Sequence, residues 1–150
     1  MKIILIFIAV YILSFKSQAQ SAMDSVKQVV NNLFTAMKTS DPGLLRSTFA
    51  DSAILQTIEK DKTGKVRIKT EVITEFADFL KSEEKGSMDE QIIFDVIKIN
   101  ADLASIWTPY KFFYKGKFSH CGVNSFQLVR INNVWKIQYL IDTRSRLGCL

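Results

Sequence analysis

Hydrophobic residues in the first part of the chain recur at helical spacing. The apolar positions are Val26, Val29, Val30, Leu33, Phe34 and Met37. They follow one another at i, i+3, i+4, i+7, i+8 and i+11, which places them along one stripe of a helix. Asp41-Pro42 then supplies an N-cap and a first-turn proline for a short second helix that holds Leu44, Leu45 and Phe49. The pattern therefore predicts two helices at the start of the domain.

The pattern then changes to strands. Ser52 to Ile58 and Val66 to Ile68 are joined by the turn Asp61-Lys62-Thr63-Gly64 and predict a β-hairpin. Thr70 is expected to cap a third helix, whose apolar residues Val72, Ile73, Phe76, Phe79 and Leu80 share one side. Four strands are predicted after it, at residues 91–99, 104–114, 118–131 and 134–141. Helices followed by a long antiparallel sheet indicate an α+β fold with the helices on one face.

Two short turns allow a strand register to be written for the last part of the chain. A two-residue turn at Lys115-Gly116 pairs Lys111 with His120, and one at Asn132-Asn133 pairs Asn124 with Ile141. One face then carries Trp107, Phe113, Phe118, His120, Asn124, Phe126, Leu128, Trp135, Ile137, Tyr139 and Ile141. We expect this apolar face to be the core. The opposite face carries Thr108, Tyr110, Phe112, Tyr114, Ser119, Cys121, Val123, Ser125, Gln127, Val129, Lys136, Gln138 and Leu140. It holds enough aromatic surface to suggest a homodimer contact, and a bulge in any strand would exchange the two faces beyond it.

Residues 1–19 have the pattern of a secretory signal. Met1-Lys2 is a short positive segment, residues 3–15 are almost entirely apolar, and Ser17-Gln18-Ala19 is a small-x-small cleavage site. The apolar run is shorter than the ~20 residues that a membrane-spanning helix needs, and no cysteine follows the cleavage site to take a lipid. The sequence predicts export to the periplasm or the medium, no stable membrane anchor, and one domain over residues 20–150.

Charge and composition narrow the classes of partner. The formal net charge of the chain is +5, and without Lys2 and Lys16 it is +3, from 18 basic and 15 acidic side chains. Because the basic residues are dispersed, nucleic acid is not an expected partner. One histidine and two distant cysteines have no compact metal-ligand spacing, so no metal site is expected, and no cofactor motif is found.

Cys121 and Cys149 gain importance from the predicted export, because a disulfide persists in an oxidising compartment. A bridge between them would stabilise the fold by about 3 to 4 kcal/mol through the chain entropy of the unfolded state. The alternative is a buried, free Cys121 and a frayed Cys149. The spacing of the two residues leaves both readings open.

The order of elements, a helical hairpin, a strand pair, a helix and a meander of long strands, resembles the nuclear transport factor 2-like fold. Five segments are similar to an exported bacterial branch that is named for lumazine binding: Leu55-Gln56-Thr57, Lys60-Asp61-Lys62-Thr63-Gly64-Lys65, Phe118-Ser119-His120-Cys121-Gly122-Val123, Trp135-Lys136-Ile137 and Asp142-Thr143-Arg144. The resemblance implies a cone whose sheet curls around a pocket. Relatives of this fold include isomerase-like, dehydratase-like and cyclase-like enzymes and binding proteins without catalytic activity, so the fold does not decide between them.

His120 is the only side chain on the predicted core face that titrates near neutral pH. Asn124 and Tyr139 add hydrogen-bonding groups on that face, and Trp107 and Phe126 add flat apolar walls, which together describe a small-molecule pocket. His120 as a neutral core histidine is the alternative. Asp142 is expected beside Val123 on the opposite face, so a His120–Asp142 dyad would need a bulge near Gly122.

Three functions follow from these residues. The first is an exported, cofactor-free homodimer that binds a small apolar or heteroaromatic ligand between Trp107, Phe126 and Tyr139, with His120 and Asn124 orienting it. The second is a cofactor-free isomerase, dehydratase or cyclase in which His120 transfers a proton. The third is a protein-interaction module that uses the outer sheet face.

Overall fold

The structure, a computed structural model, describes residues 22–149. The predicted signal sequence and its cleavage site before Gln20 lie outside the described residues. Among the described residues, no helix combines the length and the apolar character that a membrane crossing requires. The elements are a first helix (22–39), α2 (Pro42–Thr48), β1 (Phe49–Lys60), β2 (Val66–Glu71), α3 (Ile73–Ser82), β3 (Met88–Ile92), β4 (Val96–Asn100), β5 (Leu103–Tyr114), β6 (Lys117–Ile131) and β7 (Val134–Thr143).

The two helices predicted at the start of the domain are confirmed. Val26, Val30 and Leu33 of the first helix are almost completely buried, as the apolar stripe requires. Asp41 caps α2 by accepting a hydrogen bond from the Leu44 amide at 2.9 Å, and Pro42 occupies the first turn. Phe49, predicted to be helical, instead begins β1.

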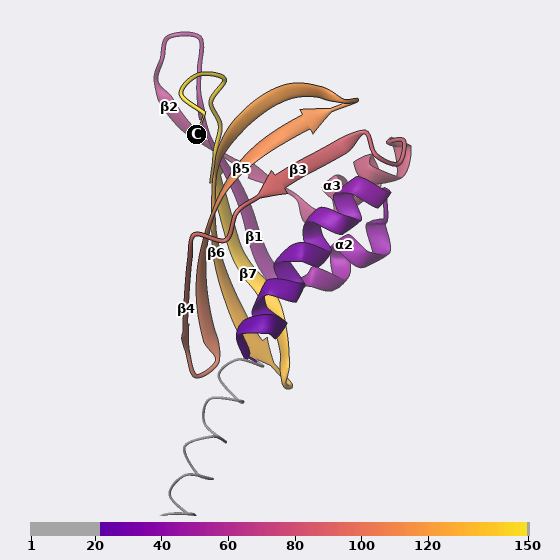
Figure 1. Cartoon of the computed structure of the whole chain (residues 1–150), viewed down its shortest axis with the longest axis vertical. Coiled ribbons are helices and arrows are strands. Elements are labelled where there is room, and N and C mark those ends of the chain that lie inside the picture. The colour runs from indigo at the N-terminus through magenta and orange to yellow at the C-terminus, as the bar shows by residue number, and fades with distance from the viewer. Residues whose placement is uncertain (1–21, 150) are drawn as a thin grey trace, which may run out of the picture.

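The sheet contains seven strands in the order β2-β1-β7-β6-β5-β3, with β4 also paired to β5. Only the β1–β7 pairing is parallel among these strands, so the sheet is mixed and mostly antiparallel. Figure 1 shows a strongly curved sheet with the helices packed against its concave side. The tail after β7 lies near the β1–β2 hairpin, in agreement with a hydrogen bond between Arg144 and Thr57 of β1.

The core fills the space between the helices and the concave face of the sheet. Its largest fully buried side chains include Phe126, Leu128 and Ile137 from the sheet and Leu33 from the first helix. The ring of Phe34 meets that of Phe126 edge-on, with centroids 6.3 Å apart. Burial thus follows the predicted core face over this part of β6 and β7.

The predicted strand register is correct between each turn and the first bulge after it, and it is wrong by one residue beyond that bulge. Phe113 pairs with Phe118 as expected, but His120 pairs with Phe112 instead of Lys111, because Ser119 is an extra residue on β6. Beyond the second turn, Asn124 pairs with Asp142 instead of Ile141, because Gln138 is an extra residue on β7.

Each bulge shifts the pairing by one residue, so beyond it the predicted inner and outer faces of β5 and of β7 are exchanged relative to β6. The prediction that Trp107 and Tyr139 point into the core is therefore wrong. The inner face carries Thr108 and Tyr110 of β5 and Leu140 and Asp142 of β7 in their place, all at least nine-tenths buried. The two bulges therefore bring polar side chains to the inner face.

Two further expectations about the elements are wrong. Thr70 does not cap α3, because it lies in β2 opposite Gln56 and accepts a hydrogen bond from the Gln56 side chain at 3.1 Å. The helix begins instead after Val72, which makes no side-chain cap bond. The single strand predicted for residues 91–99 is interrupted at residues 93–95 and forms β3 and β4, which pair with different halves of β5.

Candidate functional site

A cavity of about 290 Å³ lies between the helices and the concave face of the sheet. Leu33, Phe34 and Met37 of the first helix and Phe76 and Phe79 of α3 form one wall. The sheet supplies the opposite wall, which is apolar near Phe49, Leu55, Met88, Phe112 and Leu140. A concave, mainly apolar cavity with a few polar groups is the usual form of a small-molecule site.

Glu90 of β3 and Asn124 of β6 form a polar pair in the cavity wall. Asn124 donates a hydrogen bond from Nδ2 to Glu90 Oε1 at 2.8 Å. Both side chains reach the cavity across β5, which lies between their strands in the sheet. Burial raises the pKa of Glu90 from its ordinary 4.5 to about 7, the Asn124 bond opposes this change, and the nearby charge of Asp142 adds to it. Glu90 can therefore gain or lose a proton at neutral pH.

A second polar cluster is centred on Asp142. Its carboxylate accepts hydrogen bonds from Thr57 Oγ1 at 2.6 Å, from the Tyr110 hydroxyl at 3.1 Å and from Arg144 Nε at 2.9 Å. Arg144 also donates from Nη2 to Thr57 Oγ1, and the Tyr110 hydroxyl lies 2.9 Å from the Thr143 carbonyl oxygen. Burial and the charge of Asp142 raise the pKa of Tyr110, so the phenol keeps its proton. The Asp142 charge is thus compensated inside the protein.

His120 lies on the cavity wall between two aromatic rings. Its ring centroid is 5.7 Å from that of Tyr110 and 5.1 Å from that of Phe112. The Ser119 hydroxyl lies 3.0 Å from Nδ1 of His120. Burial and then the positive charge of Arg144 lower the pKa of His120, so the imidazole is neutral at pH 7.

The bulges bring Asp142 to the inner face, yet no hydrogen bond joins it to His120 among the described residues. Its carboxylate is occupied by Thr57, Tyr110 and Arg144. The arrangement is an ion pair between the buried Asp142 and the partly exposed Arg144, with two hydroxyl donors, rather than a His–Asp dyad. The extra donors stabilise the buried carboxylate, because they satisfy oxygens that burial removes from water.

The predicted pocket residues are divided by the structure. His120 and Asn124 line the cavity. Phe126 is fully buried in the core and is not one of the lining residues. Tyr139 donates a hydrogen bond from its hydroxyl to Gln56 at 2.8 Å, and Trp107 is 45% exposed on the outer face. Because of the two bulges, Trp107 and Tyr139 lie outside the lining of the cavity.

Sequence reasoning missed Glu90, Tyr110 and Arg144 as cavity residues. Glu90 lies in the segment Met88-Asp89-Glu90-Gln91, which is too polar to read as a strand facing a core. The alternation of inner and outer side chains along a strand would have identified Glu90 only if the start of β3 at Met88 had been known. Met88, Glu90 and Ile92 then share the inner face.

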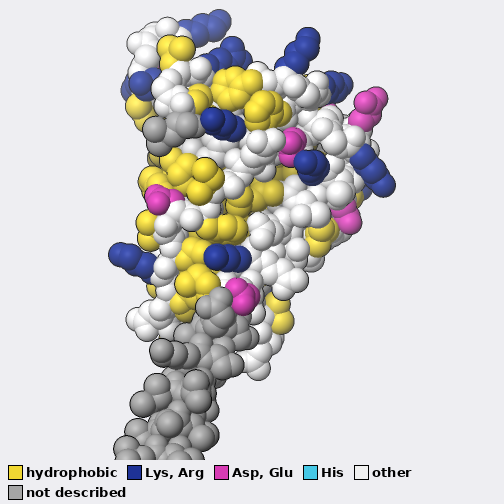
Figure 2. Space-filling view, viewed as in Figure 1, with side chains coloured by type: hydrophobic (Ala, Val, Ile, Leu, Met, Phe, Trp, Pro, Cys, Tyr) yellow, Lys and Arg dark blue, Asp and Glu magenta, His cyan; other side chains and the backbone are white. Residues whose placement is uncertain are grey.

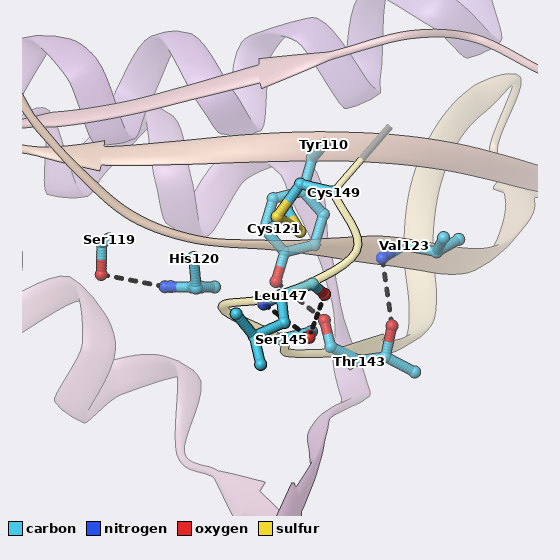
Figure 3. The surroundings of a disulfide bond; sticks show 9 residues. All are labelled: Tyr110, Ser119, His120, Cys121, Val123, Thr143, Ser145, Leu147 and Cys149. Carbon is cyan, nitrogen blue, oxygen red and sulfur yellow. Dashed lines mark hydrogen bonds between the residues drawn. A yellow bond between two sulfur atoms is a disulfide. The ribbon is translucent and has the colours of Figure 1, made fainter.

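The structure joins Cys121 and Cys149 in a disulfide with a sulfur–sulfur distance of 2.01 Å. Figure 3 shows that the bridge folds the tail back beside Tyr110 and His120. Cys121 and Ser145 also exchange two backbone hydrogen bonds of 2.8 Å, so the tail extends the β6–β7 pairing. The bridge thereby helps to hold Arg144, which precedes this segment, at the cavity. Among residues 22–149, no cluster of histidine, cysteine and acidic side chains is suited to hold a metal ion.

No protein-family model matches this sequence, and no curated protein matches it. Solved structures do match it. An NTF2-like protein of unknown function from Shewanella baltica is 15% identical, with a TM-score of 0.64 over 83% of this chain and 94% of that one. A protein of unknown function with a cystatin-like fold from Nostoc punctiforme is 13% identical, with a TM-score of 0.63 over 82% and 90% of the two chains.

A third similar structure, from Streptomyces avermitilis, is described as a dehydratase candidate of the NTF2-like family; it is 14% identical, with a TM-score of 0.63 over 85% of this chain and 98% of that one. At such identities the likeness concerns the fold alone. It agrees with the observed order of elements, with helices packed on a curved, mixed sheet of seven strands. The chain has the α+β, nuclear transport factor 2-like fold.

Proposed function

We propose that this protein is an exported domain that binds a small molecule in the cavity between the helices and the sheet. The apolar or heteroaromatic part of the ligand packs against Phe34, Phe76 and Phe112, and its polar group meets Glu90 and Asn124. The observation that carries the proposal is the Glu90–Asn124 pair, which exposes hydrogen-bonding groups to a cavity of about 290 Å³ with mainly apolar walls. Cavities that serve only packing are seldom lined by a carboxyl group.

Export is supported by two separate features. The first 19 residues have the composition of a secretory signal. The Cys121–Cys149 bond is of the kind that persists in a periplasm or outside the cell. The resemblance to the lumazine-binding branch fits a flat heteroaromatic ligand such as a pterin, although the similar solved structures support the fold only.

Native mass spectrometry of the unreduced protein tests this proposal. We expect the folded protein to carry additional small-molecule mass, or to bind the neutral fluorescent probe N-phenyl-1-naphthylamine with an enhanced, blue-shifted emission. Leu55 lines the cavity, so Leu55→Trp should fill it and abolish both signals. Ile68→Trp, on the exposed face of the β1–β2 hairpin, is the control and should retain them. A folded wild-type protein that carries no ligand and binds no probe would refute the proposal.

A second candidate function is acid–base catalysis without a cofactor, as in an isomerase, dehydratase or cyclase. It is favoured by Glu90, whose pKa of about 7 suits a group that both accepts and donates protons at neutral pH. Among the structural neighbours, one is described as a dehydratase candidate. His120, predicted from the sequence as the catalytic group, is neutral at pH 7 and can contribute a hydrogen bond or a second proton acceptor.

Kinetics with a substrate can distinguish Glu90 from His120 as the group that transfers the proton. If Glu90 transfers the proton, Glu90→Gln abolishes turnover and His120→Gln retains part of it. The wild-type pH–rate profile should then have a limb near pH 7. Turnover that survives in Glu90→Gln and disappears in His120→Gln would assign the chemistry to His120.

We also propose that two copies associate through the outer face of the sheet. The strand register aligns Val96, Trp107, Ser125 and Ile141 in one row across β4, β5, β6 and β7. Val96 and Trp107 are 41% and 45% exposed, and Ile54 and Leu103 add exposed apolar surface. Figure 2 shows one face of the molecule, on which hydrophobic side chains form an interrupted band along the long axis with lysine and arginine between them. A patch of this kind is typical of a protein contact.

A further inference from the structure

The charged groups around the cavity are compensated with one exception. Asp142 forms an ion pair with Arg144 at 2.9 Å, and Glu71 of β2 forms one with Lys69 at 2.7 Å. Arg144 also lines the cavity, so the Asp142–Arg144 pair contributes almost no net charge there. Glu90 takes part in none of the ion pairs among the described residues.

The missing partner of Glu90 is notable in a protein with an excess of lysine and arginine. The chain has 20 basic and 15 acidic side chains. Among residues 22–149, the only side-chain hydrogen bond to Glu90 comes from the neutral amide of Asn124. Glu90 is partly buried, and a carboxylate in such a place without an ion-pair partner is costly to keep ionised, so the site is poised to receive a positive charge from outside.

We infer that the ligand of this cavity is a small organic cation, an apolar or aromatic molecule with one protonated amino group that pairs with Glu90. This inference rests on the proposed small-molecule-binding function and names its ligand class. The walls suit such a ligand, because the rings of Phe34, Phe76, Phe79 and Phe112 line the same cavity. Aromatic faces attract cations, and more strongly where water is excluded.

The other charge classes fit less well. An anion would meet the Glu90 carboxyl group, and the guanidinium that could compensate it already binds Asp142 and Thr57 through Nε and Nη2. A neutral ligand would leave the carboxylate unpaired or require it to be protonated. A cation would pair with Glu90 directly, whereas Arg144 acts on Glu90 only through its charge and donates its hydrogen bonds to Asp142 and Thr57.

The pH dependence of binding follows from the groups that face Glu90. These are Glu71 of β2, Tyr110 of β5, His120 of β6, Asp142 of β7 and Arg144 after it. Tyr110 and Arg144 keep their protons near neutral pH, and Arg144 forms an ion pair with Asp142 at 2.9 Å. The pKa of His120 is lowered, whereas that of Glu90 is raised to about 7. Glu90 is therefore expected to contribute most of the change in charge between pH 6 and pH 8.

A cation binds the ionised form of Glu90 and so lowers its pKa. Between pH 6 and pH 8 the ionised fraction of a group with a pKa of 7 rises about tenfold, so the affinity of a cation that binds the ionised form about tenfold more tightly than the protonated form should rise by about fivefold. Binding at pH 7 should release about half a proton per ligand. A neutral ligand that accepts a hydrogen bond from protonated Glu90 would show the opposite sign.

Three indole compounds of similar size provide the test: tryptamine, a cation; indole-3-ethanol, which is neutral; and indole-3-propionate, an anion. Isothermal titration calorimetry of the unreduced protein at pH 8 should show tryptamine binding at least about tenfold more tightly than the other two, a gain in the range reported for desolvated ion pairs. Titration at pH 7 in phosphate and in Tris should reveal the released proton. The same titrations at pH 6 and pH 8 should show the expected change of about fivefold in tryptamine affinity.

Glu90→Gln removes the charge and retains the side-chain shape and the acceptor for Asn124. It should reduce the tryptamine affinity about tenfold, abolish the proton release and leave indole-3-ethanol unchanged. Glu59→Gln, at the exposed end of β1, is the matched control and should bind tryptamine as the wild type does. If Glu90→Gln retained the full pH dependence, the titrating group would be His120 and the assignment to Glu90 would be overturned.

The outcomes separate this inference from the proposed function. If N-phenyl-1-naphthylamine binds but tryptamine has no advantage over indole-3-ethanol, the cavity is a binding site and the cation preference is refuted. If neither the naphthylamine probe nor any indole compound binds, both proposals fail. A tenfold preference for tryptamine that disappears in Glu90→Gln establishes the inference.

Discussion

Two neighbouring carboxyl groups on β3 have opposite environments. Asp89 accepts a hydrogen bond from the Gln91 side chain and forms an ion pair with Lys38 at 2.9 Å, and these contacts lower its pKa. Glu90 meets the neutral amide of Asn124 inside the cavity, and burial raises its pKa to about 7. One residue along the strand thus separates a surface ion pair from a group that titrates at neutral pH, because successive side chains point to opposite faces.

Glu90 should make the stability of the protein fall as the pH rises. Between about pH 4.5 and pH 7 the folded protein holds a proton on Glu90 that the unfolded chain has lost, so the free energy of unfolding decreases across this window. The free energy of unfolding of Glu90→Gln should not show this decrease, because glutamine does not titrate. Relative to the wild type, the variant should therefore gain on the order of 2 kcal/mol between pH 5 and pH 8, because one pKa unit corresponds to about 1.4 kcal/mol and cavity water reduces the effect.

Urea unfolding followed by circular dichroism at both pH values measures this difference. Glu59→Gln is the control, since an exposed glutamate should shift stability equally at pH 5 and pH 8. An equal effect of Glu90→Gln at the two pH values would show that Glu90 titrates normally in the folded protein.

At the scale of the elements, the helices and strands could be predicted from the sequence and the register could not. Apolar spacing found the first helix, and Asp41-Pro42 found the start of α2. Both two-residue turns form with positive φ angles, at Lys115 and Gly116 and at Asn132 and Asn133. The bulges at Ser119 and Gln138 have no such signal, because any residue can be the extra one.

This gap decided how much of the site could be found. The predicted inner face of β6 was correct beyond its bulge, so His120 and Asn124 line the cavity as expected. The two register shifts changed only the faces of β5 and β7 relative to β6. Trp107 was assigned to the pocket and Asp142 to the outer face because the bulges lie between these residues and the turns used to place them. The network of Thr57, Tyr110, Asp142 and Arg144 joins β1, β5 and β7, so only the folded arrangement reveals it.

Gly122 of β6 lies in close contact with Thr143 of β7 and Tyr110 of β5. A Cβ atom at this position would lie 1.8 Å from the Thr143 carbonyl oxygen and 3.0 Å from the Tyr110 ring. The oxygen belongs to the backbone, so it cannot move aside without breaking the pairing of the tail with β6. We expect Gly122→Ala to lower the free energy of unfolding by about 3 kcal/mol or more, at the upper end of the usual cost of overpacking.

Chemical denaturation of Gly122→Ala beside Gly43→Ala tests this expectation. Gly43 lies in α2, where the new Cβ would be 3.3 Å from Asp41 Oδ1, the side-chain oxygen that caps the helix. Alanine has the higher helix propensity, so Gly43→Ala should change stability by less than about 1 kcal/mol. Equal stability of the two variants would mean that the tail can shift away from Gly122 at little cost.

At the scale of the whole molecule, the curvature of the sheet gives its two faces different roles. The concave face holds the core and the cavity under the helices (Figure 1). The convex face receives the side chains that the bulges turn outward, including Trp107, Tyr139 and Ile141. The residues predicted to enclose a ligand thus became candidates for an interface between two copies.

The dimer proposed for this face depends on Trp107 more than on any other side chain of the row, because it is large, 45% exposed and directly opposite Val96 and Ser125 in the strand register. We expect the wild type to be a dimer and Trp107→Lys to be a monomer in size-exclusion chromatography with light scattering, since a buried lysine without a partner opposes association. Val72→Lys, at an exposed apolar position before α3, should remain dimeric. Trp107 is remote from the lining of the cavity, so monomeric Trp107→Lys should still bind N-phenyl-1-naphthylamine as the wild type does. A dimer that persists in Trp107→Lys would move the interface to another surface, and a monomeric wild type would leave the convex face free for a different protein partner.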